Sequence, residues 1–267
     1  MTTSPLTPRQ IEGAFGDLEP TAPPTTALEE WSRFYRFVKS PRLPVEGVSH
    51  TGAARATTRM LGLDIVFMVG FIAALGLAAA LGFTPPENIN STLEPNLMNL
   101  FLVVAFAPLG EEILFRSWLS GRPGVIAAVL VAIVGFGLLP ALGMSLEEGV
   151  PRQIVLIAGP ALAIVGVPLS GYFLLGKATP EFFRRAFTVF FWLSSIAFAL
   201  IHLANYTEGS LAILLPLVLP QFALGTMLAY LRVHYGFVTA LALHAIHNAL
   251  LFGLAVLGGL GGEAGAT

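Results

Sequence analysis

Seven long hydrophobic segments constrain this chain more than any other feature of its sequence. A helix needs about 20 predominantly apolar residues to cross a bilayer, and every segment reaches that length. An apolar solvent also requires each backbone polar group to be bonded within the spanning structure, which favours helices. We therefore predict an all-α, polytopic transmembrane helical bundle with about seven spans, at residues 60–83, 97–120, 123–144, 153–176, 186–205, 210–231 and 236–260.

The composition supports a protein that is embedded in lipid. Hydrophobic residues make up 55% of the chain and charged residues only 11%, whereas soluble domains carry about 25% charged residues. The formal net charge of −2 and the lack of a basic patch give no reason to expect a nucleic-acid partner. The absence of cysteine excludes disulfides, thiolate chemistry and cysteine-ligated metal.

The first 59 residues differ from the rest. They combine proline, threonine and mixed charge without the apolar core of a cleaved signal peptide. We predict that 1–59 forms a cytoplasmic tail that begins disordered, and that 60–262 forms the transmembrane domain. The stretch 27–40 places Trp31, Phe34 and Phe37 on one side of a short helix, which predicts a helix lying at the membrane interface; partner binding is the alternative.

The charges of the loops predict an orientation. With the amino terminus inside, the cytoplasmic loops collect most of the cations, as the positive-inside rule requires: Arg33, Arg36, Lys39, Arg42, Arg55, Arg59, Arg122, Lys177, Arg184, Arg185 and Arg232. The opposite side receives Arg152 and six acids. Arginine far outnumbers lysine, which is typical of a GC-rich bacterial genome. We predict an integral protein of a bacterial cytoplasmic membrane with its amino terminus in the cytoplasm.

A few ionisable residues lie inside the predicted spans, where an acid or arginine costs about 2.5–3.5 kcal/mol near the bilayer centre. Asp64 lies near one end of the first span, so snorkelling or capping accounts for it. The others fall in three groups, EEILFR (111–116), FALIH (198–202) and HAIHN (244–248). Buried polar groups of this kind mark functional sites by default, although pairing between helices is the competing explanation.

Helical geometry assigns different surroundings to these groups. Glu112 and Arg116 are four residues apart, so they share a face and can form an ion pair. Glu111 is turned by about 100° from Glu112 and can face a cavity. His244 and Asn248 also share a face. Together these residue types suffice for hydrolysis: a carboxylate takes a proton from water, an imidazole orients that water, and a second imidazole and an amide stabilise an oxyanion.

The three groups, in this order, resemble the motifs of the CAAX protease and bacteriocin-processing family, also called the Abi family. EEILFR resembles its EExxxR motif, FALIH its FxxxH motif and HAIHN its HxxxN motif, over roughly residues 97–252. The resemblance implies a CAAX-protease-like core and an intramembrane endopeptidase that acts on a membrane-associated protein or peptide. It implies these roles: Glu111 as general base aided by His202, His244 and Asn248 as the oxyanion site, and Glu112 and Arg116 in support, with an exchange of roles between the two acids as the alternative.

The cofactor stays open at the level of sequence. The resemblance allows either a metalloprotease or a metal-free glutamate mechanism. Glu111, His202 and His244 form a plausible zinc set with an open water position, whereas the helical HExxH signature is absent.

One departure from the family pattern is the insertion of two spans between Glu111 and His202, which we expect to shape the substrate opening. Two other functions compete with proteolysis. The first is a proton or solute transporter with a Glu/His relay, and the second is a membrane immunity or scaffold protein. The sequence does not specify the substrate, the cleavage site or the oligomeric state.

Overall fold

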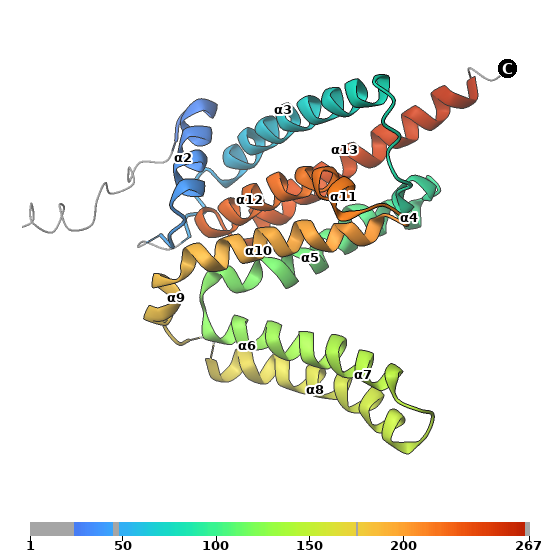
Figure 1. Ribbon diagram of the computed structural model, residues 1–267. Coiled ribbons are helices and arrows are strands. Elements are labelled where there is room, and N and C mark those ends of the chain that lie inside the picture. The colour runs from blue at the N-terminus through green and yellow to red at the C-terminus, as the bar shows by residue number, and fades with distance from the viewer. Residues whose placement is uncertain (1–23, 45–47, 175, 265–267) are drawn as a thin grey trace, which may run out of the picture.

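A computed structural model describes residues 24–44, 48–174 and 176–264, and its regular elements are helices (Figure 1). Six helical stretches are long and apolar enough to cross a membrane, and a seventh is a pair of helices that meet at 45°. The prediction of an all-α bundle with about seven spans is confirmed. The predicted disordered start of the chain lies outside the described residues.

The spans run as follows. The first is α3 (Ala53–Ala80), the second α4 (Leu97–Phe101), η2 (Leu102–Phe106) and α5 (Ala107–Phe115), and the third α6 (Pro123–Ala132), η4 (Ile133–Leu138) and α7 (Leu139–Ser145). The others are α8 (Val150–Leu174), α10 (Phe187–Ile201) with η5 (His202–Asn205), the bent pair α11 (Leu211–Leu217) and α12 (Leu219–His234), and α13 (Phe237–Ala264). Outside the spans lie α2 (Ala27–Lys39), η1 (Ile89–Thr92), η3 (Ser117–Ser120) and α9 (Glu181–Arg185).

Two helices differ from the uninterrupted spans that the sequence predicts. Helix α3, which contains the first predicted span, begins at Ala53 rather than at 60, so its first turns carry charged and polar residues of the predicted tail. The sixth is broken at Val218, between Pro216 of α11 and Pro220 of α12. Proline has no N–H and clashes with the preceding turn, so two prolines four residues apart end one helix and start another.

Proline also explains the π-helical turn η2 inside the second span. The Ala107 N–H donates to the carbonyl of Leu102 instead of that of Val103, and Pro108 has no N–H to offer. The Val103 carbonyl therefore loses both backbone donors that a helix would bring to it. The same pattern recurs at η4, where Leu139 donates to Val134 and Pro140 follows. Turns of this kind often occur at functional sites.

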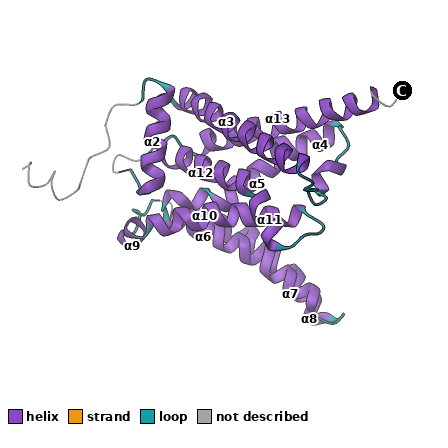
Figure 2. Cartoon of the chain, turned by 45° about the horizontal axis from the view of Figure 1, so that its top comes forward, coloured by secondary structure: helices purple, strands orange, loops and turns teal. Residues whose placement is uncertain are grey.

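The two inserted spans form a hairpin of α6–α7 against α8. Figures 1 and 2 show α7 and α8 projecting away from the remaining helices, and the hairpin meets them chiefly through η3 at the start of α6. Glycine permits the close approach of its two arms, because a Cβ at Gly159 would come within 2.6 Å of the Gly135 carbonyl oxygen. Small residues at the interface are typical of helices that pack within lipid.

Helix α12 lies at the centre of the core, and α2 packs against it. The Glu30 carboxylate is fully buried and accepts hydrogen bonds from the Tyr230 hydroxyl at 2.5 Å and the Tyr235 hydroxyl at 2.9 Å. Arg59 lies 3.6 Å from the same carboxylate. The predicted helix at 27–40 is present, and its apolar face packs into the bundle, with Phe37 buried in the core.

The ends of the bundle differ in charge. The basic helices α2 and α9 lie at the left end in Figure 1, whereas the acidic turn between α7 and α8 lies at the opposite end. This arrangement places the cation-rich loops of the positive-inside prediction together. Which end faces the cytoplasm stays a prediction.

Candidate active site

Helix α5 carries the two carboxylates and the arginine, and the fold gives them different surroundings. Glu112 and Arg116 are both fully buried, and Arg116 Nη1 donates to Glu112 Oε1 at 2.9 Å. The predicted ion pair is confirmed. The side chain of Glu111 is 29% exposed, because one step along the helix turns it away from the pair.

His244 connects the carboxylates of α5 to α13. Its Nδ1 lies 2.9 Å from Glu112 Oε1, and its Nε2 lies 3.5 Å from Glu111 Oε2. Glu112 Oε1 thus accepts from both Arg116 and His244, so the Nδ1 atom of His244 carries a proton whenever Glu112 is ionised. The first and third motifs, separated by more than 120 residues, therefore meet at one imidazole.

The Phe198 ring of α10 brings the second motif to the same place. The Arg116 guanidinium lies 3.6 Å above the centre of that ring. The ring also packs edge-on against His202, at 4.8 Å between centroids, and against His244, at 5.6 Å. Phe198 is fully buried, so one phenyl group contacts a side chain from each motif and fixes their separation.

His202 has a defined tautomer. Its Nδ1 lies 2.7 Å from the backbone carbonyl of Phe198, and a carbonyl oxygen can only accept, so Nδ1 carries the proton. The Nε2 atom of the neutral ring is then left with its lone pair. A ring in this state can accept a hydrogen bond from water.

Asn248 makes a contact that its sequence motif did not predict. Its Nδ2 donates to the Val103 carbonyl at 2.9 Å, and this is the carbonyl that η2 and Pro108 deprive of backbone donors. One of the two amide N–H groups is thereby engaged in joining α13 to the second span. The other remains for the predicted oxyanion role.

The expectation that Asp64 snorkels or caps its helix was wrong. It is buried, at 3% exposure, and its carboxylate accepts from His247 Nδ1 at 2.7 Å, so snorkelling or capping does not explain it. Helix α3 starts seven residues before the predicted span, so Asp64 lies about three turns into the helix rather than near its end. The sequence contained a signal for this contact, because Asp64 in the first span and His247, the second histidine of HAIHN, had no other assigned partners.

The far end of α5 is held by groups that the sequence did not single out. Arg232 of α12, predicted as a loop cation, donates to the carbonyl oxygens of Arg116 at 3.2 Å and Ser117 at 3.0 Å. The Ser194 hydroxyl donates to the Phe115 carbonyl at 2.6 Å. These bonds satisfy carbonyls that a helix end leaves without partners.

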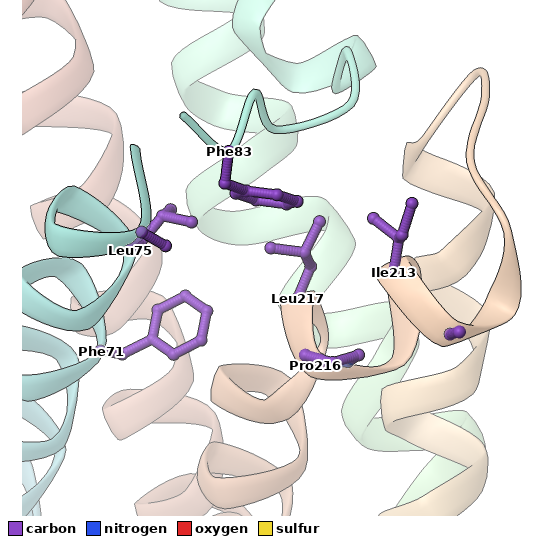
Figure 3. A pocket seen from close by; sticks show the side chains of 8 residues that line it. Phe71, Leu75, Phe83, Ile213, Pro216 and Leu217 are labelled. Atoms are coloured by element: carbon purple, nitrogen blue, oxygen red, sulfur yellow. The ribbon is translucent and has the colours of Figure 1, made fainter. Parts of the chain in front are cut away.

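An apolar pocket lies between α3 and α11 (Figure 3), with a volume of about 320 Å³. Its lining includes Phe71, Phe83, Ile213 and Leu217 but no ionisable side chain, so it is separate from the reacting groups. Phe71 follows Asp64 by seven residues on the same face of α3, about 10 Å along the helix.

The geometry around Glu111, His202 and His244 bears on whether these residues can hold zinc. Two contacts would suit metal binding. Glu112 accepts from one nitrogen of His244, and the Phe198 carbonyl accepts from one nitrogen of His202. In metal sites, acceptors of this kind orient the histidines that bind the metal. Within the described residues, however, no three His, Cys, Asp or Glu side chains are grouped closely enough to hold a metal ion. The set Glu111, His202 and His244 does not fit a zinc site in this arrangement.

Comparison with known proteins gives one family. The model of the type II CAAX prenyl endopeptidase Rce1-like family matches residues 93–250, which is more than half of the chain and includes all three motifs. Neither a curated protein nor a solved structure matches the chain.

Proposed function

The chain belongs to the type II CAAX prenyl endopeptidase Rce1-like family, and from this premise we propose that it is an intramembrane endopeptidase. It hydrolyses a peptide bond in a membrane-associated protein or peptide. The observation that supports this most strongly is the position of His244, whose two ring nitrogens face Glu111 and Glu112. An imidazole between a buried and a partly exposed carboxylate is an arrangement suited to moving protons.

Glu111 is the general base in this proposal. It is the more exposed of the two carboxylates, so water can reach it, and it lacks the direct hydrogen bond to Arg116 that ties down Glu112. It takes a proton from water as that water attacks the substrate carbonyl. His202, with its Nε2 lone pair, accepts a second hydrogen bond from the same water and orients it.

His244 and Asn248 stabilise the oxyanion. Because Nδ1 of His244 donates to Glu112, its Nε2 can donate to the oxyanion only when the ring is an imidazolium. Burial disfavours that charge, and the two carboxylates within 3.5 Å offset part of this cost. The proton that Glu111 takes from water finally reaches the leaving amine, which completes hydrolysis into an acid and an amine.

We assign supporting roles to Glu112 and Arg116. The pair orients His244 and, through the Phe198 ring, the position of His202. The working mechanism contains no metal step, because the candidate ligands are not grouped as a ligand set. Treating the purified protein with a chelator and then measuring both its zinc content and its activity tests this choice. Zinc-free protein that stays active supports a mechanism without a metal step. Loss of stoichiometric zinc together with activity would overturn it.

The substrate is proposed to enter from the lipid. The apolar pocket on the Asp64 face of α3 suits a hydrophobic part of a substrate while the scissile bond reaches Glu111. The amino terminus is proposed to face the cytoplasm of a bacterial cell. Since the chain has no cysteine, single cysteines at Lys39 and at Glu208, labelled in intact cells with an impermeant maleimide, test this orientation: only the second should react.

Cleavage assays test the proposal directly. Purified protein in detergent is mixed with fluorogenic membrane-anchored peptides, with and without a prenylated CAAX end. Wild type should cleave at least one peptide, whereas Glu111→Gln and His202→Ala should lose most of the rate. Equal cleavage by all three proteins would reject the assigned roles.

A further inference from the structure

Helix α13 is joined to three different parts of the bundle by three side chains within five residues. His244 contacts the carboxylates of α5, His247 donates to Asp64 of α3, and Asn248 donates to the Val103 carbonyl of η2. The bonds made by His247 and Asn248 involve neither Glu111 nor Glu112. They nevertheless lie beside His244, which contacts both of these carboxylates.

The positions of His247 and Asn248 around the axis of α13 indicate what their two bonds do. At 100° per residue, His247 lies about 60° to one side of His244 and Asn248 about 40° to the other. The bonds to α3 and to η2 therefore flank the His244 side chain. A rotation of α13 in either direction has to stretch one of them.

A buried polar pair such as Asp64–His247 is not needed if α3 and α13 only have to pack against each other. Both side chains are more than 90% buried, and their 2.7 Å contact joins helices 183 residues apart in the chain. A carboxylate inside a membrane span is costly, and apolar side chains would pack α3 on α13 without that cost. Asp64 also lies outside the part of the chain that matches the family model.

We propose that Asp64 and His247 are positioning residues, which hold α13 at the rotation that places His244 between Glu111 and Glu112. This inference rests on the proposed function only for its effect on rate. The first span is then part of the catalytic apparatus rather than an added anchor. The pair works together with the Asn248–Val103 bond, which resists rotation in the opposite direction.

The sensitivity of the site supports this role. The tip of a side chain lies about 6 Å from a helix axis, so a 20° rotation moves it by about 2 Å. His244 makes its contacts at 2.9 and 3.5 Å, and such a shift breaks both. A misplacement of about 1 Å can cost a factor of about 10² in rate.

Steady-state kinetics distinguish positioning from binding. Asp64→Ala and His247→Ala should each lower kcat by about 10- to 100-fold and leave KM within about twofold. Asp64→Asn should recover most of kcat, because its side-chain oxygen still accepts from His247 Nδ1. The double variant should be no slower than either single variant, since both remove one bond.

A matched control removes a different buried carboxylate. Glu30→Gln weakens the bonds to Tyr230 and Tyr235 but touches no part of α13 that faces the site, so it should lower thermal stability and keep kcat. If Asp64→Ala lowers kcat no more than this control does at equal stability, the positioning role is wrong.

A spectroscopic measurement decides the same question without activity. Cysteines at Val69 of α3 and Leu254 of α13, both more than half exposed, accept spin labels in this cysteine-free chain. Asp64→Ala should broaden or shift the distance distribution, and Asp64→Asn should leave it unchanged. An unchanged distribution in Asp64→Ala contradicts the inference, whereas wild-type protein that cleaves no peptide contradicts only the proposed function.

Discussion

The substitution Gly225→Ala probes how tightly the three motifs are held together. Gly225 of α12 lies against the junction of the motifs: a Cβ there would come 3.0 Å from Phe198 Cδ1 and 3.3 Å from Arg116 Nη2. Phe198 cannot move freely, because it is fully buried beneath the Arg116 guanidinium and packed against His202. The added methyl group has to displace the ring, and the ring takes the arginine and the imidazole with it.

The size of the effect follows from the distances. Restoring ordinary contact requires a shift of about 0.5 Å, and since about 1 Å costs up to 10²-fold in rate, we expect kcat to fall about tenfold. Stability should change less. The helix gains about 1 kcal/mol from replacing glycine, which offsets much of the 1–3 kcal/mol that overpacking typically costs.

The assay compares initial rates at saturating peptide with thermal unfolding in the same detergent. Gly253→Ala on α13 is the control, because nothing lies within 4 Å of its added Cβ, and it should raise stability and keep the rate. Gly225→Val should be slower still. Wild-type kcat in both Gly225 variants would refute the idea that Phe198 fixes the spacing of the motifs.

Three further outcomes are expected. Arg116→Met strands the buried Glu112 carboxylate and should lower the free energy of unfolding by about 3–5 kcal/mol, seen as a lower melting temperature. Phe71→Ala enlarges the apolar pocket and should raise KM with kcat retained, most of all for peptides with long apolar ends. Burial and then the Glu30 carboxylate raise the pKa of Tyr235 to about 12; neutral Tyr235 is thus favoured in the fold, stability should fall between pH 10 and pH 12, and absorbance at 295 nm should show this tyrosine ionising near pH 12.

Much of this architecture could be predicted from sequence, because the bilayer imposes length and helicity on each span. The Glu112–Arg116 pair also followed from local spacing alone, since residues four apart in a helix face the same way. Phe198 and His202 are likewise four residues apart, so their contact also follows from local spacing. These features depend on a single helix, so a one-dimensional pattern contains them.

Contacts between helices were not predictable in the same way. No local pattern indicates that Glu112 accepts from His244, or that Asn248 donates to the Val103 carbonyl, because each bond depends on the rotation and depth of two helices. The Asn248 contact further depends on η2, which Pro108 and the Ala107–Leu102 bond create together. The role of Asp64 was misread because its partner, His247, lies on another helix 183 residues away.

The central claim is that Glu111 activates water at a centre built from three separated helices. Cleavage in H₂¹⁸O with mass spectrometry of the products tests it most directly. Wild-type protein should introduce one ¹⁸O atom into the new carboxyl terminus of the peptide, and Glu111→Gln should form almost none of that product. Labelled product at the wild-type rate from Glu111→Gln would contradict the account.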